Sequence, residues 1–320
     1  MVRRSPYLAL LLTMAGWGSA FPTSKIAVEH VPHEVAALLR FGGGALALLA
    51  FMAVTRRGAS VPARDRLRAG AAGLVGVFAY NALFFWGLSL APALDGSIIV
   101  PVLSPVLTTA ALVLTRREKS GMGRTIGLAL GVAGAVLFFL GVAGAPHGGG
   151  SRLAGDLVYL LGALTWAGYT LLGKRVLAGI DPLPATTYGM LSGAMALGLY
   201  ASPKLGNVAW SALPASFWLD TLYLVTAPTA LAYVLYYVGV RGVGPAIASM
   251  MMFAVPVFGA VGSYLLLRET IGVVQALGGL VMLAGALLAI TDGRLLRRLP
   301  APDRSGPTAV PHGTAGAHRG

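Results

Sequence analysis

The sequence predicts an all-α polytopic membrane protein in which ten transmembrane helices form two inverted repeats of five helices each. The first observation is composition, because 56% of the 320 residues are hydrophobic and only 11% are charged, whereas a soluble domain carries about 25% charged residues. The second is that the apolar residues form runs of about 20 residues, the length that crosses a bilayer as a helix. The third is that motifs of the first half recur in the second half.

The ten predicted spans are joined by connectors too short to hold a soluble domain. The first run follows Arg3 and Arg4 and could pass for a signal peptide. It stays apolar beyond Trp17 and contains Pro22, so we expect it to remain as an uncleaved span. The predicted spans are 6–27, 33–54, 69–90, 93–114, 124–143, 154–174, 184–201, 218–239, 245–266 and 271–291.

Matching residues in the two halves predict an internal repeat. Trp166 follows Trp17 by 149 residues, and Pro256 follows Pro105 by 151 residues. Because each half holds an odd number of spans, the second half must enter the membrane from the opposite face, as in inverted-repeat transporters. Other matches pair Lys25 with Lys174, Phe85-Trp86 with Tyr236-Tyr237, Glu118 with Glu269, Gly127 with Gly278 and Gly134 with Gly285.

The positions of Lys and Arg predict the orientation of the chain. When the N-terminus is placed in the cytoplasm, 19 of the 24 Lys and Arg residues fall on the cytoplasmic side. This asymmetry predicts a multi-pass protein of the bacterial inner (plasma) membrane with both termini cytoplasmic. The two repeats are expected at 1–148 and 149–293, and the Pro- and Gly-rich residues 294–320 are expected to form a disordered cytoplasmic tail.

Composition also argues against several kinds of partner and chemistry. The formal charge of +13 comes from short basic clusters between apolar runs, which is a membrane-orientation pattern and not a phosphate-binding face. The chain has no cysteine, and its five histidines form no ligand-spaced pair on an apolar helix. We therefore expect no nucleic acid, no cofactor and no metal. The expected partners are the lipid bilayer and a small-molecule substrate, and the oligomeric state is left open.

Several short motifs occur in the same order along the chain: Trp17–Pro22, Ala36–Phe41, Ala91–Ala93, Ser97–Ile99, Pro105 and Glu118, then Gly155–Leu157, Trp166-Ala167, Pro256, Glu269 and Gly278-Gly279. With this ordered set, the chain resembles the EamA-type transporters of the drug/metabolite transporter superfamily over about residues 6–292. The resemblance implies a ten-helix fold with a central cavity and export of small metabolites, often amino acids or related compounds. One departure is that the second half has no Arg to match Arg40.

Aromatic residues near the middle of spans are candidate substrate contacts. Trp is typical of the membrane interface, so central Trp residues at matching repeat positions indicate a cavity wall that can stack on a ring or a cation. Tyr side chains that share a helix face also need partners for their hydroxyls in hydrocarbon. Packing between helices is the alternative for all of them. The aromatic candidates are Trp17, Tyr80, Trp166, Tyr169, Tyr233 and Tyr237.

Two polar residues complete the predicted substrate site. Arg40 lies about 5 Å from the middle of the second span, where a charge costs about 2.5–3.5 kcal/mol on insertion scales. It should therefore face the bundle interior, held either by carbonyls or by an anionic group of a substrate. Asn81 is central in the third span, and its amide needs either a substrate or a neighbouring helix as a partner.

Other polar and punctuating residues favour structural roles. Glu118 and Glu269 precede the fifth and tenth spans, where a carboxylate favours a helix N-terminus. No Asp or Glu lies securely at mid-span, so the sequence shows no obvious carboxylate to relay protons. Gly127 and Gly131 form a G-x-x-x-G pair that allows close helix packing. The prolines that interrupt spans can act as hinges or only curve the bundle; they are Pro22, Pro101, Pro105, Pro228 and Pro256.

These features favour a secondary transporter that works by alternating access around a central cavity. The chain has no G-x-x-x-x-G-K-[ST] motif, so an ion or substrate gradient would have to supply the energy. An intramembrane enzyme is one alternative, but H-E-x-x-H, G-x-S-x-G and a pair of mid-span acids are all absent from the sequence. A scaffold or receptor is another alternative, and the sequence contains no large extramembrane domain that would indicate it.

Overall fold

Helices make up all the regular structure in the described part of a computed structural model, which covers residues 5–55, 61–115, 121–143, 150–243, 248 and 251–291. The first half contains α1 (Ser5–His30), α2 (His33–Val54), α3 (Ala63–Gly73), η1 (Leu74–Ala79), α4 (Tyr80–Leu90), α5 (Ala93–Leu114) and α6 (Met122–Ala143). The second half contains α7 (Gly150–Val176), α8 (Pro182–Leu205), η2 (Trp210–Ala212), α9 (Ala215–Val225), η3 (Thr226–Leu231), α10 (Ala232–Val243), η4 (Met252–Ala254), α12 (Val255–Leu267) and α13 (Val273–Thr291).

Six of the described helices are long and apolar enough to cross a membrane, which supports a multi-pass membrane protein. Two of these six are composite, since α3, η1 and α4 run on as one rod and α9, η3 and α10 run on as another. The others are α2, α5, α6 and α13. The predicted tail (294–320), the boundary between the predicted repeats at 148/149 and Glu118 all lie outside the described residues.

Proline and short turns fix where several helices begin. Pro32, Pro62, Pro92 and Pro214 each occupy the N-cap position before α2, α3, α5 and α9. Proline suits this position because its fixed φ is compatible with an extended backbone and because no hydrogen bond from its missing N–H is needed there. The start of α8 uses another device: the Asp181 carboxylate accepts a hydrogen bond from the Leu183 backbone N–H at 3.2 Å.

The prolines inside the predicted spans have different local effects. Pro22 lies within the continuous helix α1, and Pro101 and Pro105 lie within α5. Pro228 lies in η3, a π-helical segment, whereas Pro256 stands at the beginning of α12 directly after the 3-10 turn η4. The π-helical segment η1 contains no proline, so proline alone does not explain where the helices are irregular.

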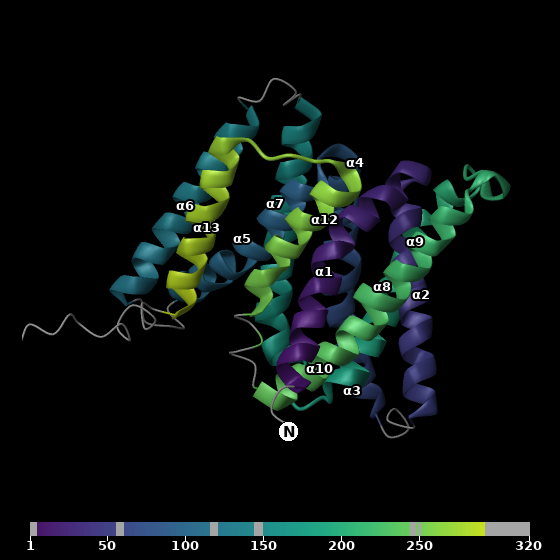
Figure 1. The fold of residues 1–320 in the computed structure, drawn as a ribbon. Coiled ribbons are helices and arrows are strands. Elements are labelled where there is room, and N and C mark those ends of the chain that lie inside the picture. Colours follow the sequence, from purple (N-terminus) through teal and green to yellow (C-terminus); the bar gives the residue numbers. More distant parts are fainter. Residues whose placement is uncertain are drawn as a thin grey trace, which may run out of the picture.

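The helix bundle has two ends, which are named by the parts of the chain that lie there. We call the end of the bundle at which α1 begins the near end (bottom of Figure 1), and the opposite end, with the α1–α2 turn, the far end. Helix α1 packs between α10 and α12, while α7 packs against α4 and α5. In Figure 1 the pair α6 and α13 stands at one flank, with α5 running between this pair and the rest of the bundle.

Glycine allows α6 and α13 to pack backbone to backbone. A Cβ atom added at Gly285 would lie 2.4 Å from the Gly131 backbone nitrogen, and one at Gly134 would lie 2.4 Å from the Met282 backbone nitrogen. Because the obstructing atoms are main-chain atoms, they cannot move aside as a side chain would. The sequence prediction of glycine-mediated packing at Gly127 agrees with this arrangement, since its Cβ would meet Ala289 at 2.3 Å.

We expect Gly285→Ala to destabilise the protein by about 1–3 kcal/mol, the usual cost of overpacking. The reason is that the new methyl group would force α6 and α13 apart at the Gly131 backbone. Thermal unfolding of the purified protein in detergent measures the change. Gly168→Ala in α7 is the matched control, because no atom lies within 4 Å of the added Cβ. Equal unfolding temperatures for the two variants would contradict the predicted role of close packing.

Candidate functional site

A cavity of about 280 Å³ lies among the helices at mid-depth. Its walls come from both halves of the chain, and most of its lining is apolar or aromatic with a few hydroxyl and amide groups. Such a lining is typical of small-molecule sites. The lining residues are Trp17, Ala20, Phe21, Arg40, Tyr80, Asn81, Phe84, Val100, Pro101, Ser104, Pro105, Thr108, Thr109, Trp166, Thr170, Tyr233, Met252, Val255 and Ile290.

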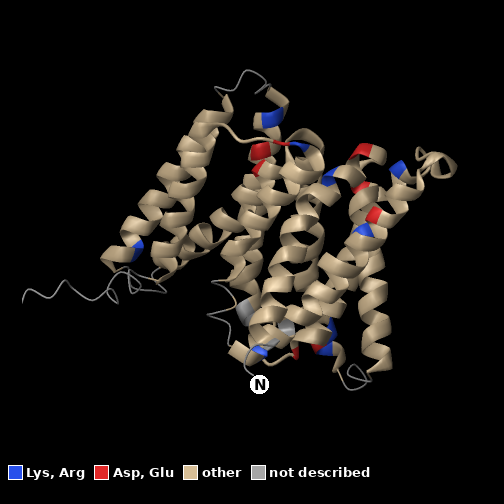
Figure 2. Ribbon diagram, in the orientation of Figure 1, with Lys and Arg blue, Asp and Glu red and all other residues tan. Residues whose placement is uncertain are grey.

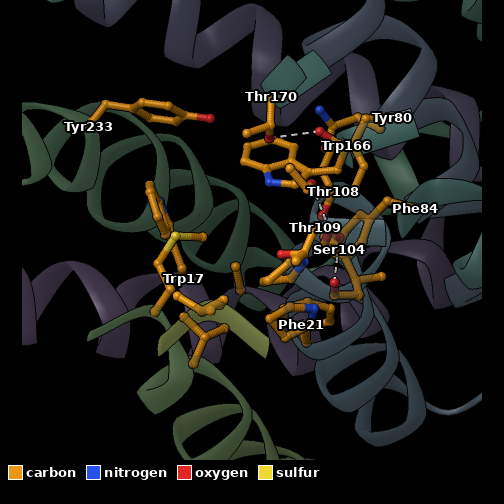
Figure 3. A pocket seen from close by; sticks show the side chains of 18 of the residues that line it. Trp17, Phe21, Tyr80, Phe84, Ser104, Thr108, Thr109, Trp166, Thr170 and Tyr233 are labelled. Carbon is orange, nitrogen blue, oxygen red and sulfur yellow. Dashed lines mark hydrogen bonds between the residues drawn. The ribbon is translucent and has the colours of Figure 1, made fainter. Parts of the chain in front are cut away.

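Aromatic side chains form two facing walls of the cavity. Trp17 of α1 and Tyr233 of α10 lie together on one side, with ring centroids 5.7 Å apart (Figure 3). Tyr80 of α4 and Trp166 of α7 lie on the other side, with centroids 4.9 Å apart. The two walls could therefore hold a flat or cationic group between them, because aromatic faces attract both.

Arg40 brings the one positively charged side chain among the described lining residues. It is 7% exposed, and its Nε and Nη1 donate to the hydroxyl oxygens of Thr229 (3.2 Å) and Ser24 (3.1 Å). Its guanidinium also lies over the ring of Phe41, 4.9 Å from the centroid. Within the described residues no carboxylate pairs with Arg40. A buried guanidinium held only by hydroxyls and rings can accept an anionic ligand.

Asn81 shows how a polar group is kept in the membrane interior. Its amide Nδ2 donates to the Val77 carbonyl oxygen at 2.7 Å, one turn earlier along the same rod. That carbonyl belongs to η1, a π-helical segment (Leu74–Ala79) directly before α4. The side chain is 3% exposed and lines the cavity. Its Oδ1 is left without a hydrogen-bond donor in the described part of the chain, which makes it a candidate acceptor for a ligand.

The structure thus brings six of the eight predicted substrate contacts around one cavity: Trp17, Arg40, Tyr80, Asn81, Trp166 and Tyr233. Tyr169 does not line it. Its ring lies against Gly76 of η1, where an added Cβ would be 2.4 Å from the ring, and it contacts Trp166 at 5.4 Å between centroids. The packing alternative therefore fits Tyr169. The side chain of Tyr237 lies outside the described residues.

One whole wall of the cavity was missed by reasoning from the sequence. Helix α5 contributes Ser104, Thr108 and Thr109 beside the prolines Pro101 and Pro105. Small hydroxyl residues give a weak sequence signal, because their hydroxyls can bond to the preceding turn, as Ser104 does to the Val100 carbonyl oxygen at 2.6 Å. The two prolines in one helix were the available signal that this helix faces a cavity.

The cavity lining continues toward the near end and stops short of the far end. At the near end it includes Thr170 of α7 and Ile290, the last residue but one of α13. On the far side its last contributions are residues such as Phe21 and Val100, which lie about two turns or more inside the ends of α1 and α5. The far end of the bundle is closed by a different group of residues.

Charged residues of both signs gather at the far end (Figure 2). Arg152 of α7 makes a two-pronged ion pair with Asp95 of α5, with Nε–Oδ2 at 2.7 Å and Nη2–Oδ1 at 3.0 Å. Lys25 of α1 donates to the Leu88 carbonyl oxygen at 2.6 Å and to that of Ala91 at 3.1 Å. These contacts tie the turn between α4 and α5 to α1 and to α7.

Glu269 forms, with Lys25, Asp95, Arg152 and Asp156, the group of charged residues that we call the far-end cluster, and it corrects one expectation. The sequence placed its carboxylate at the start of its own helix, but the structure shows it capping α5. Its oxygens accept hydrogen bonds from the backbone N–H groups of Ala93 (2.9 Å) and Leu94 (2.7 Å). A carboxylate suits these otherwise unpaired N–H groups and the positive end of the helix.

The surroundings of Glu269 have opposing effects on the pKa of its carboxyl group. Burial raises the pKa of the Glu269 carboxyl group above its ordinary value, and the Asp95 charge acts in the same sense. The backbone N–H groups of Leu94 and Ala93 and the Lys25 ammonium act in the opposite sense, and burial is the largest influence.

The groups that line the cavity are suited to binding a small molecule. It offers stacking surfaces, one guanidinium and one amide oxygen, and Arg40 is the only charged group lining it in the described part of the chain. No group of three or more His, Asp or Glu residues able to hold a metal ion is present among the described residues.

Comparison with known proteins gives a consistent family. The model of the EamA-like transporter family matches residues 4–140 and again residues 153–291. The match therefore occurs twice and covers most of the chain.

Individual relatives are similar over nearly their full lengths. The uncharacterized transporter YyaM of Bacillus subtilis is 27% identical over 288 residues, which is 88% of this chain and 92% of YyaM. A probable terminal-alkyne amino-acid exporter of Streptantibioticus cattleyicolor is also 27% identical, over 88% of this chain and 91% of its own length. A protein of known crystal structure has the same fold, with a TM-score of 0.59 and 22% identity over 93% of this chain and 100% of its own.

We expect Glu269→Ala to lower the free energy of unfolding by about 0.5–2 kcal/mol, the usual loss when a helix cap is removed. The substitution would leave the N–H groups of Ala93 and Leu94 without their acceptor. Chemical or thermal unfolding in detergent measures it. Glu29→Ala is the control, since Glu29 is exposed and caps no helix in the part of the chain that the structure describes. A loss of the same size in both variants would contradict the capping role.

Proposed function

Because this chain belongs to the EamA-like transporter family, we propose that it is a secondary membrane transporter that exports small metabolites, such as amino acids or related compounds. The observation that supports it best is the mid-depth cavity with aromatic walls and a guanidinium that forms no ion pair with a carboxylate of the described residues. A transported molecule with a carboxylate and an apolar or aromatic body would satisfy both features. The relative from Streptantibioticus, named a probable terminal-alkyne amino-acid exporter, favours the same substrate class and direction.

We further propose that the chain crosses the membrane ten times as two inverted five-helix repeats. The two π-helical segments support this, because η1 begins at Leu74 and η3 begins at Thr226, a spacing of 152 residues that agrees with the sequence repeat. The helix pairs support it too. Helix α1 packs against α10 and α12, and α7, its counterpart in the second repeat, packs against α4 and α5, the counterparts of those helices. In addition to the six long apolar helices, α1, α7, α8 and the segment ending with α12 would cross.

The proposed orientation places the near end in the cytoplasm of a bacterial cell and the far end outside its inner membrane. The Lys and Arg distribution supports it. With this orientation, the cavity lining that continues to Thr170 and Ile290 faces the cytoplasm, where an exported metabolite would be loaded. The far-end charges would then close the outer side. In the proposed cycle the two repeats rock about the cavity and expose it to each side in turn.

Export is expected to depend on the cavity tryptophan Trp166. Removing its ring by Trp166→Ala would remove one stacking wall next to Tyr80. We expect a metabolite to accumulate in the medium of cells that make the intact protein but not of cells that make Trp166→Ala at equal membrane level. Mass spectrometry of the medium identifies it.

Trp218→Ala is the matched control for that comparison, because Trp218 lies on α9 outside the described cavity and is 44% exposed. Cells that make this variant should export normally. Media that are identical for cells with and without the intact protein would contradict export, and normal export by Trp166→Ala would contradict the site.

Arg40 is expected to bind the carboxylate of the exported molecule. Arg40→Gln should raise the half-saturating substrate concentration about 10- to 100-fold, because a hydrogen bond to a charged group contributes about 1.5–3 kcal/mol. Arg40→Lys should recover part of this loss, since a lysine keeps the charge but not the two-pronged geometry. Uptake of the labelled metabolite into proteoliposomes measures it.

Arg66→Gln is the control for the Arg40 variants. Arg66 donates to the Val61 carbonyl oxygen near the start of α3 and does not line the described cavity. An unchanged half-saturating concentration in Arg40→Gln, with transport intact, would show that the guanidinium does not bind the substrate.

A further inference from the structure

The far-end cluster contains a buried carboxylate without a partner. Asp156 of α7 is fully buried, and neither of its oxygens meets a hydrogen-bond donor in the described residues. The carboxyl group that it faces, within hydrogen-bonding reach, belongs to Asp95 of α5, which is also fully buried. Two ionised carboxylates offer each other only acceptors, so this arrangement is complete only when a proton lies between them.

The charge balance around the pair also favours the binding of one proton. The two-pronged contact of Arg152 with Asp95 neutralises one of the two carboxylates. The second negative charge would remain in a buried place beside a like charge, which is why one member of such a pair holds a proton. With the proton, the Asp95–Asp156–Arg152 group is neutral; without it, the group carries one net negative charge.

The neighbouring titratable groups do not remove this charge. On α7, Tyr159 lies close to both carboxyl groups, but its hydroxyl is used by the Pro92 carbonyl oxygen at 3.3 Å. Glu269, from the connection between α12 and α13, adds a further negative charge near Arg152 and Asp95. Lys25 of α1 interacts with Glu269 and with the exposed Glu29.

The same residues join the two halves of the molecule at the closed far end. Asp95 belongs to the first half, whereas Arg152 and Asp156 belong to the second. Glu269 adds a second link, from the second half to the N-terminus of α5. Separation of the halves at this end would bring water to both carboxylates, and water stabilises their ionised forms.

We propose that the Asp95–Asp156 carboxyl pair is a proton-binding site: it holds one proton while the far end is closed and releases that proton when the far end opens. The inference rests on the proposed function, because opening and closing of the far end are steps of the transport cycle. One proton is exchanged with the far side in each opening and closing. Acid on that side therefore favours the closed state.

The absence of cysteine from the native chain makes a direct test possible. Ser97→Cys places a thiol at the far end, at a fully buried position of α5 that packs against Gly259 of α12. Thr108→Cys places one in the cavity lining toward the near end. The full-length protein in nanodiscs is labelled with a small, water-soluble thiosulfonate reagent from about pH 5.5 to about pH 8.5.

Labelling at Ser97→Cys, divided by labelling at Thr108→Cys at the same pH, is expected to rise with pH by up to about tenfold per pH unit, the limit for release of one proton. Asp156→Asn mimics the protonated pair, because its amide can donate to Asp95. In this background the ratio should stay low and independent of pH. Because the same two thiols are labelled in both backgrounds, the comparison removes the pH dependence of the thiols themselves. Asp65→Asn is the control, since Asp65 pairs with Arg68 at the near end at 2.8 Å, and it should keep the native pH dependence.

A labelling ratio that does not change with pH in the otherwise native chain would overturn the proton site, even if Asp156→Asn failed to insert. A ratio with the native pH dependence in Asp156→Asn would also overturn it. Failure of the proposed function gives a different result: the ratio would depend on pH, and the proton site would stand, while no metabolite moved in the export assay. Export together with a flat ratio would leave the function standing and remove the proton site.

Discussion

The constraint on which the rest of this structure depends is that a chain inside a bilayer must satisfy its backbone polar groups by itself. It explains why the described residues form helices and why binding groups come from side chains or from irregular turns. Asn81 uses both sources, since its amide bonds to the Val77 carbonyl oxygen within the π-helical segment η1. The same constraint operates at helix ends, where Glu269 supplies the acceptor that the first N–H groups of α5 lack.

Close packing is the second consequence, because lipid gives helices little hydrophobic reason to associate. Helices α6 and α13 approach until glycine backbones touch at Gly131 and Gly285. The pair forms a flank of its own, with α5 between it and the rest of the bundle. Glycine has a further use at Gly76, where the absence of a Cβ gives the Tyr169 ring its place. That contact, and not the cavity, fixes the position of Tyr169.

The sequence predicted the helical class and six of the residues that line the described cavity for a physical reason. Large aromatic or polar groups such as Trp17, Arg40 and Asn81 are costly inside a long apolar run, so their depth along the helix marks an interior surface. The far-end cluster was not predictable in this way. Asp95 and Arg152 lie near the ends of their runs, where charges ordinarily face water, and 57 residues separate them. Only the packing of α5 against α7 shows that they meet in a buried place.

The cavity and the far-end cluster make the two ends of the molecule different. The cavity lining runs toward the near end, while the contacts that join the two halves at the far end include hydrogen bonds to charged groups as well as the packing of Ser97 against Gly259. Such hydrogen bonds are strong where water is excluded, and they weaken as soon as water can replace each partner. An apolar seal would lack this property, since exposure to water would only drive it shut again. Closure by Asp95, Arg152 and Glu269 therefore suits an end that, in the proposed cycle, must hold firmly and still open.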